Sequence, residues 1–163
     1  MTSVMSDPED IRGWQRLGAG TTTSGRLEAH DPERLAAIGV GHVINLALDD
    51  HPEALDREAE RLAALGIGYT HIPVPFDAPS EAHFDTFVCA LGAIAVPVHV
   101  HCIMNWRVSA FFYRLNRQRG MHEAEARTLM QVHWDPQSSE NPHAPAWARF
   151  IAAESLANPP IPR

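Results

Sequence analysis

The apolar positions of this chain follow two alternating periods. In residues 53–65 and 84–92 they recur every three or four positions, which predicts helices with one apolar face. Between such segments lie short runs rich in β-branched and apolar residues, which predict strands at residues 42–46, 68–74 and 96–100. Strands joined by helices favour a parallel sheet with helices on both faces. We therefore predict a single α/β domain with a central, mostly parallel sheet of four or five strands.

Further helices are predicted where apolar spacing coincides with start and stop signals. They cover residues 31–39, 107–119, 123–132 and 146–156. The run at 96–100 is the most apolar of the strands, so we expect it at the centre of the sheet. Residues 158–163 read Asn-Pro-Pro-Ile-Pro-Arg and predict an extended tail. The predicted domain therefore covers residues 1–157.

Composition excludes several classes of protein. Hydrophobic residues make up 45% of the 163 positions, which is too many for a wholly disordered chain. Twenty acidic residues against thirteen basic ones give a formal net charge of −7. Nucleic acids and anionic membranes attract basic surfaces, so we expect neither as a partner. Residues 1–10 are acidic and no stretch has the length of a membrane span, so we expect a cytoplasmic protein.

The charges and cysteines are unevenly placed. Residues 101–119 contain four arginines and no acidic residue, which predicts a local basic patch. We interpret Arg114, Arg117 and Arg119 as a solvated helix face, the alternative being a positive field that attracts a phosphorylated partner. The two cysteines lack metal-binding spacing and form no disulfide scaffold, so we expect reduced thiols. Cys89 is expected in the core, with a role as a resolving thiol as the alternative.

The candidate chemistry lies directly after the central strand, in a loop that leads into a helix. Ligands in parallel sheets bind beyond the carboxyl ends of the strands. Loop amides and a helix N-terminus would hold a tetrahedral anion above Cys102, and Arg107 could bind two of its oxygens. The alternative is that Cys102 is a buried thiol and Arg107 a surface charge. The loop reads His101-Cys102-Ile103-Met104-Asn105-Trp106-Arg107.

This loop resembles that of the cysteine-dependent protein tyrosine and dual-specificity phosphatases, above all small bacterial phosphatase-like proteins. The resemblance covers residues 14–120 and also includes Ser109 and the upstream segment 69–79, Tyr-Thr-His-Ile-Pro-Val-Pro-Phe-Asp-Ala-Pro. It implies hydrolysis of a phosphomonoester, on a protein or a small molecule, through a phosphocysteine intermediate and without a cofactor or metal. The implied roles are Cys102 as nucleophile, Arg107 as phosphate clamp, Asp77 as general acid, Ser109 as the hydroxyl that eases thiolate departure, His101 as the residue that orients the loop, and Ile103, Met104, Asn105 and Trp106 as the phosphate cradle.

The loop departs from the family pattern in its length. Four residues separate Cys102 from Arg107, where the family has five. An ungapped alignment keeps Ser109 in register and places Val108 at the arginine position. Asn105 stands where glycine is usual, and asparagine is the other residue that best adopts a positive φ. The short loop is also similar to that of rhodanese-type sulfurtransferases, so a Cys102 persulfide is one alternative function and a non-catalytic phosphate-binding pseudophosphatase is another.

Several residues have a structural alternative to their implied role. Asp77 could be a turn residue that satisfies amides before the next helix, with Asp49 and Asp85 as weaker acid candidates. The Ser109 hydroxyl could bond a carbonyl in the preceding turn. Trp106 could stack on an aromatic substrate or form a pocket wall. We expect His99 to be a satisfied core histidine rather than a metal ligand with His71, His101 and Cys102. Trp134 and Trp147 are expected to pack.

Overall fold

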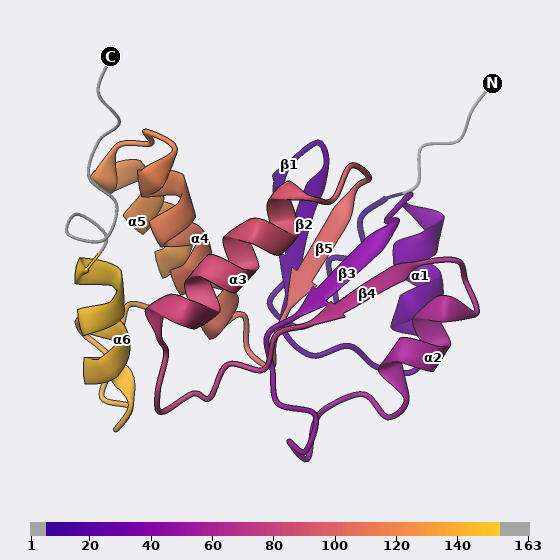
Figure 1. The fold of residues 1–163 in the computed structure, drawn as a ribbon, viewed down its shortest axis with the longest axis horizontal. Helices are drawn as coiled ribbons and strands as arrows, with labels where there is room; N and C mark the ends of the chain where they lie inside the picture. The colour runs from indigo at the N-terminus through magenta and orange to yellow at the C-terminus, as the bar shows by residue number, and fades with distance from the viewer. Residues whose placement is uncertain (1–5, 154–163) are drawn as a thin grey trace.

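The computed structural model describes residues 6–153 and contains one five-stranded sheet (Figure 1). Its strands are β1 (Gln15–Gly18), β2 (Thr21–Ser24), β3 (His42–Asn45), β4 (Gly68–His71) and β5 (Val98–His101). They lie in the order β1-β2-β5-β3-β4, and only β1 is antiparallel to its neighbour. The prediction of a mostly parallel sheet is confirmed, as is the central position of the strand before Cys102.

Helices cover both faces of the sheet, as predicted. They are α1 (Asp31–Ala37), α2 (Glu58–Ala63), α3 (Glu81–Gly92), α4 (Trp106–Gln118), α5 (Glu123–Gln131) and α6 (Ala144–Ala152). Figure 1 shows α1 and α2 on one side of the sheet and α3 and α4 on the other, with α5 and α6 packed against α4. No helix within the described range is long and apolar enough to cross a membrane. The predicted tail at 158–163 lies outside the described residues.

The strand register divides the core into two apolar clusters. In β3, Val43 packs toward α1 and α2, whereas Ile44 belongs to the cluster on the α3 and α4 side. Val43 pairs with His99 of β5, and Ile44 pairs with Val100. Because neighbouring residues of a strand face opposite sides of the sheet, a shift of one residue would exchange the two sets. This alternation directs β5 so that its valines enter the larger core and its histidines face the smaller one.

Two elements differ from the sequence-based expectation. The hairpin of β1 and β2 was not predicted, because Gln15–Gly18 and Thr21–Ser24 contain no apolar run. Thr22 and Ser24 of β2 are nevertheless buried, and their hydroxyls bond to His99 of β5. The predicted helix at 53–65 is shorter, since α2 begins only at Glu58. The preceding Arg57 has φ 57°, a left-handed conformation that stops the helix from extending toward its N-terminus.

Arg114 is a correction to the predicted solvated helix face and basic patch. Its side chain is fully buried, and its guanidinium bonds both carboxylate oxygens of Glu81, at 2.5 and 2.9 Å. The guanidinium carbon lies 4.3 Å from the ring centre of Phe84 and 4.6 Å from that of Phe150. Arg114 therefore joins α3, α4 and α6 from inside and contributes no charge to the surface.

Arg114→Ala should destabilise the protein by about 3 kcal/mol, because the cavity between two phenylalanine rings would not refill. Arg114→Met retains most of the side-chain volume, so its loss should be about half as large. Urea unfolding of both variants measures the difference. Equal stability of Arg114→Ala and the wild type would contradict the assigned role.

Candidate active site

The candidate site lies at the carboxyl end of β5, where the strand leads into α4. His101 is the last residue of the strand, and Trp106 is the first residue of the helix. Between them, Asn105 has φ 66° and ψ 12°, in the left-handed region. This is the conformation expected where asparagine replaces glycine. The turn at Asn105 places the N-terminus of α4, with its unpaired N–H groups, directly beside the Cys102 loop.

The end of β2 packs on the back of this loop through its main chain. The Arg26 amide donates a hydrogen bond to the Ile103 carbonyl at 2.9 Å. A Cβ atom at Gly25 would lie 2.4 Å from the same carbonyl oxygen, so only glycine fits without moving the loop. The position of the Cys102 loop therefore depends on the absence of a side chain at residue 25.

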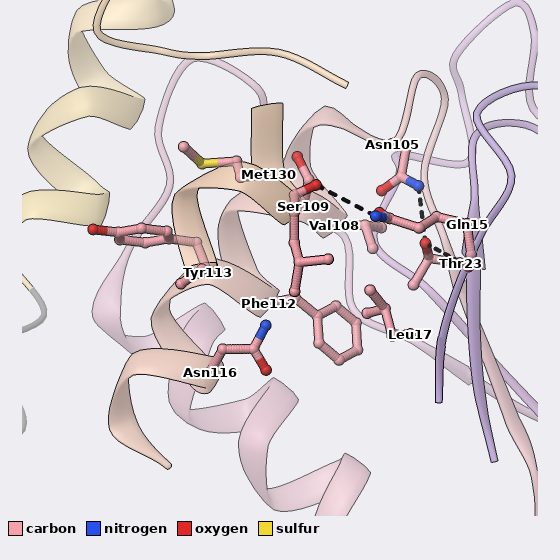
Figure 2. A pocket seen from close by; sticks show the side chains of 12 residues that line it. Gln15, Leu17, Thr23, Asn105, Val108, Ser109, Phe112, Tyr113, Asn116 and Met130 are labelled. Atoms are coloured by element: carbon pink, nitrogen blue, oxygen red, sulfur yellow. Dashed lines mark hydrogen bonds between the residues drawn. The ribbon is translucent and has the colours of Figure 1, made fainter. Parts of the chain in front are cut away.

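Asn105 is also anchored through its fully buried side chain. Its Nδ2 donates to the Gly13 carbonyl at 2.8 Å and to the Thr23 hydroxyl at 3.0 Å. His133 Nε2 lies 3.1 Å from this nitrogen and 2.8 Å from Oε1 of Gln15. Gln15, Thr23 and Asn105 are among the residues that line a small cavity between β1, α4 and α5 (Figure 2). Within residues 6–153, the Asn105 Oδ1 atom has no hydrogen-bond partner.

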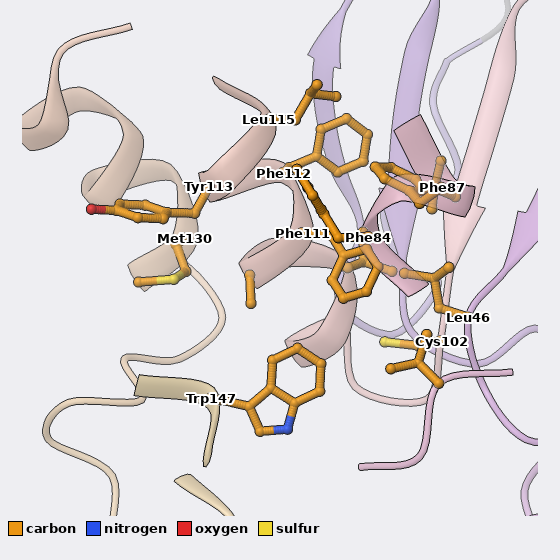
Figure 3. Packing of buried hydrophobic residues seen from close by; sticks show 14 of the residues in the cluster. Leu46, Phe84, Phe87, Cys102, Phe111, Phe112, Tyr113, Leu115, Met130 and Trp147 are labelled. Carbon is orange, nitrogen blue, oxygen red and sulfur yellow. The ribbon is translucent and has the colours of Figure 1, made fainter. Parts of the chain in front are cut away.

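Cys102 lies on the floor of the loop, at the border of the larger core. Its residue is 1% exposed, and its amide lies 3.4 Å from the Ser24 carbonyl oxygen. Figure 3 shows it near Leu46 and the aromatic side chains of the same cluster. Apolar side chains of the larger cluster therefore pack against Cys102 on the core side of the loop.

His101 links the Cys102 main chain to a buried carboxylate. Its Nδ1 lies 3.1 Å from the Cys102 carbonyl oxygen, and its Nε2 lies 2.6 Å from Oε2 of Glu58. Both ring nitrogens thus lie within hydrogen-bond range of an oxygen acceptor. Asn45 Nδ2 connects the other Glu58 oxygen, at 3.4 Å, to the Tyr69 hydroxyl, at 3.1 Å. Burial, followed by the Glu58 charge, raises the pKa of Tyr69 to about 12.

Sequence reasoning missed Glu58 and Asn45, although it gave His101 a role in orienting the loop. Glu58 lies in a polar stretch with no motif around it. Asn45 gave one usable signal, as a polar residue that interrupts an otherwise apolar strand run. The Glu58 side chain at the start of α2 reaches Asn45 of β3 and His101 of β5, and no local pattern records these contacts.

Arg107 is buried beside the loop, at 6% exposure, and is not a surface charge. Its Nη1 donates to the Val74 carbonyl at 2.9 Å, and its guanidinium lies 5.7 Å from the ring centre of Phe76. Within the described residues this is the only hydrogen bond of the side chain, so other N–H donors remain for a ligand. Val108, the other candidate for the arginine position, is fully buried in the apolar core.

The segment that carries Asp77 is fixed next to the start of α4. The Phe76 carbonyl accepts a hydrogen bond from Trp147 Nε1 at 2.7 Å, and the Phe76 ring centre lies 6.0 Å from that of Trp106. Asp77 itself is exposed in the turn. Its side chain makes no hydrogen bond within residues 6–153, and the cap of the next helix is Ser80, which accepts from the His83 amide. Asp77 is therefore not the capping residue of α3.

Ser109 and Trp106 both interact with their own helix or its neighbours. The Ser109 hydroxyl donates to the Trp106 carbonyl at 3.0 Å, which is the structural alternative stated for this residue. Trp106 stacks on Trp134, with ring centres 4.8 Å apart, and Trp134 Nε1 donates to the same carbonyl. Trp134 and Trp147 are buried, as expected for packing residues. The loop thus ends on a rigid aromatic wall.

Of the two remaining expectations, the one for His99 is confirmed and the one for Cys89 is not. His99 is confirmed as a satisfied core histidine, with Nδ1 and Nε2 each 2.8 Å from a hydroxyl, those of Thr22 and Ser24. Burial, followed by the neighbouring His101, lowers its pKa well below the ordinary value. No group of three or more potential metal ligands occurs in the described part of the chain. The expectation of a core Cys89 is wrong, because this residue is exposed on α3.

The sequence matches no protein-family model and no curated protein. Solved structures that share its fold include a phosphatase candidate (DUF442) from Shewanella putrefaciens CN-32, with a TM-score of 0.77 and 25% identity over 93% of this chain and 97% of the other. Kinase-associated phosphatase, its catalytic-site cysteine replaced by serine, gives 0.69 at 10% identity, over 84% and 86%. TpbA from P. aeruginosa, in complex with phosphotyrosine, gives 0.68 at 20% identity over 89% of each chain. This chain has the fold of the cysteine-dependent phosphatases.

Gly25→Ala should displace the Cys102 loop, because the added Cβ would lie 2.4 Å from a main-chain oxygen. We expect a loss of about 2 kcal/mol in the free energy of unfolding, the size of an overpacking effect. Gly20→Ala is the matched control, since nothing lies within 4 Å of its added Cβ. Urea unfolding measures both variants, and equal losses would show that the close approach is not the cause.

The stability of the protein should fall on acidification through His133. Burial lowers its pKa from 6.5 to about 4, so the unfolded chain binds a proton in this range while the folded protein does not. The free energy of unfolding is therefore not reduced by His133 above pH 6.5, and it declines as the pH falls from 6.5 toward 4. Between pH 7 and pH 5, His133→Gln should lose about 2 kcal/mol less stability than the wild type in urea unfolding. Parallel pH curves would contradict this.

Proposed function

We propose that this protein is a phosphatase that hydrolyses a phosphomonoester through a phosphocysteine on Cys102. The observation that carries the proposal is the junction of β5 and α4 in a phosphatase fold. The short loop at this junction contains the Cys102 thiol and ends at the N-terminus of α4. The buried side chain of Arg107 lies in the first turn of that helix and has N–H donors that are not used within the described residues. Such a loop suits a phosphoryl group, whose charge is spread over three oxygens.

In the first step, the Cys102 thiolate attacks phosphorus in line and the bond to the leaving oxygen breaks. Asp77 gives its proton to that oxygen, so the leaving group departs as a neutral alcohol or phenol. Arg107 and the loop amides stabilise the phosphoryl oxygens during transfer. In the second step, the Asp77 carboxylate takes a proton from water, which attacks phosphorus and releases inorganic phosphate and the thiolate.

The neighbourhood of Cys102 supports this reaction from below the loop. His101 donates to the Cys102 carbonyl and is held by Glu58. This bond fixes a carbonyl dipole that would otherwise be free to turn toward the anion. His101 and Glu58 are positioning residues, since neither lies between the thiol and a bound phosphoryl group.

A second candidate, sulfur transfer, is favoured by the length of the loop. With only four residues between Cys102 and Arg107, the cradle has one amide fewer than the phosphatase pattern. A rhodanese-type enzyme uses such a cradle for a persulfide. The Cys102 thiolate would attack the outer sulfur of thiosulfate and release sulfite, and the persulfide would then pass its sulfur to cyanide as thiocyanate.

The deciding experiment measures turnover of p-nitrophenyl phosphate between pH 5 and pH 8. Cys102→Ser should reduce turnover to the uncatalysed level, because the phosphocysteine cannot form. Asp77→Asn should reduce kcat about 100-fold, the usual contribution of a general acid. Glu125→Gln, which removes an exposed carboxylate on α5, is the control and should retain wild-type turnover.

Equal turnover by the wild type and Cys102→Ser would contradict the phosphatase proposal. The same variants are then compared for thiocyanate formation from thiosulfate and cyanide, where Cys102 dependence would establish the sulfurtransferase instead. Phosphate binding without turnover in either assay would define a non-catalytic phosphate-binding protein.

A further inference from the structure

Two arginines outside the candidate catalytic set lie against the Cys102 loop. Arg12 precedes β1 and Arg26 follows β2, so both occur at the edge of the sheet where β5 ends. The Arg12 guanidinium lies 3.4 Å from the sulfur of Met104, which is the most exposed residue of the loop, at 42%. The chain as a whole has a net charge of −7, whereas the two side chains beside the Cys102 loop, those of Arg12 and Arg26, are positively charged.

The main chain fixes both arginines to the loop. The Arg12 carbonyl accepts from the Gly25 amide at 2.6 Å, and the Arg26 amide donates to the Ile103 carbonyl at 2.9 Å. The same close approach that positions the Cys102 loop therefore also sets where these two side chains begin. Their side chains are about one third exposed, so they remain in contact with solvent.

Both guanidinium groups meet at one carboxylate, that of Glu53. Arg12 bonds both its oxygens, at 3.0 and 3.2 Å, and Arg26 lies 3.4 Å from one of them. These bonds, Arg12 first, hold the pKa of Glu53 below its ordinary value. Glu53 belongs to the irregular segment between β3 and α2, and its side chain is 37% exposed. Two positive charges thus share one negative partner on a segment without helix or strand.

We propose that Arg12 and Arg26 form a second anion subsite, beside the phosphoryl cradle, which Glu53 occupies in the free protein and a substrate anion occupies on binding. The inference rests on the proposed function and narrows its substrate to phosphomonoesters with a second anionic group, a carboxylate or another phosphate. The fork of Arg12 matches either group, since both present two oxygens to it. The Glu53 side chain is already partly exposed, so water can stabilise its carboxylate after displacement. Replacing it by a substrate anion therefore costs little free energy.

Calorimetric titration of the Cys102→Ser protein tests the subsite without turnover. The probes are 2-, 3- and 4-carboxyphenyl phosphate, each compared with the carbamoylphenyl phosphate of the same shape. At least one carboxylate should bind about fivefold more tightly than its amide, the size expected for one partly exposed charge pair. Adding Arg12→Gln and Arg26→Gln should remove this preference, and adding Glu53→Gln should increase it.

Arg16→Gln in the same background is the matched control. Arg16 also makes a two-point ion pair, with Asp7, but it holds the β1–β2 turn at the opposite end of β2. This variant should keep the wild-type preference. The inference is overturned if no carboxylate exceeds its amide by more than about twofold, or if the preference survives the loss of both arginines. Failure of the proposed function is distinct, since it appears as absent p-nitrophenyl phosphate turnover while the binding preference persists.

Discussion

The approach of the β2 end to the Cys102 loop is the constraint on which the rest of the site depends. Gly25 allows the Ile103 carbonyl to come within hydrogen-bond range of the Arg26 amide, with no side chain between them. That contact positions the Cys102 loop and, with it, the start of α4. It also fixes where the side chains of Arg12 and Arg26 begin. A strand of small hydroxyl residues, which contributes little to the apolar core, therefore positions the Cys102 loop.

Polar groups below the loop and aromatic groups beside it have different functions. The buried path from Tyr69 through Asn45 and Glu58 to His101 orients the main chain of Cys102. Its groups are hydrogen-bonded to one another, which offsets the cost of burying them. Aromatic packing around Phe76 instead fixes the segment of Asp77 beside Trp106 and Arg107. Both sides of the candidate site are thus held by contacts within the protein itself.

Much of the fold follows from local pattern. Apolar periodicity predicted the helices on both faces and the central strand, because each of these elements buries one face within a few turns or residues. The hairpin of β1 and β2 has no such pattern, since Thr22 and Ser24 are buried through bonds to His99 rather than by apolar packing. Arg114 was expected on a solvated helix face but is buried, for a similar reason: its partners come from α3 and α6.

By itself, the sequence determined the order of the helices and of strands β3, β4 and β5, the place of the Cys102 loop after the central strand and the left-handed turn at Asn105. These depend on residues that are neighbours in the chain. Only the tertiary structure decided that Glu58 holds His101, that Arg107 reaches Val74 and that Arg12 and Arg26 share Glu53. Each of those contacts joins segments more than twenty residues apart, and charged side chains have the same local pattern whether they end in solvent or against a distant partner.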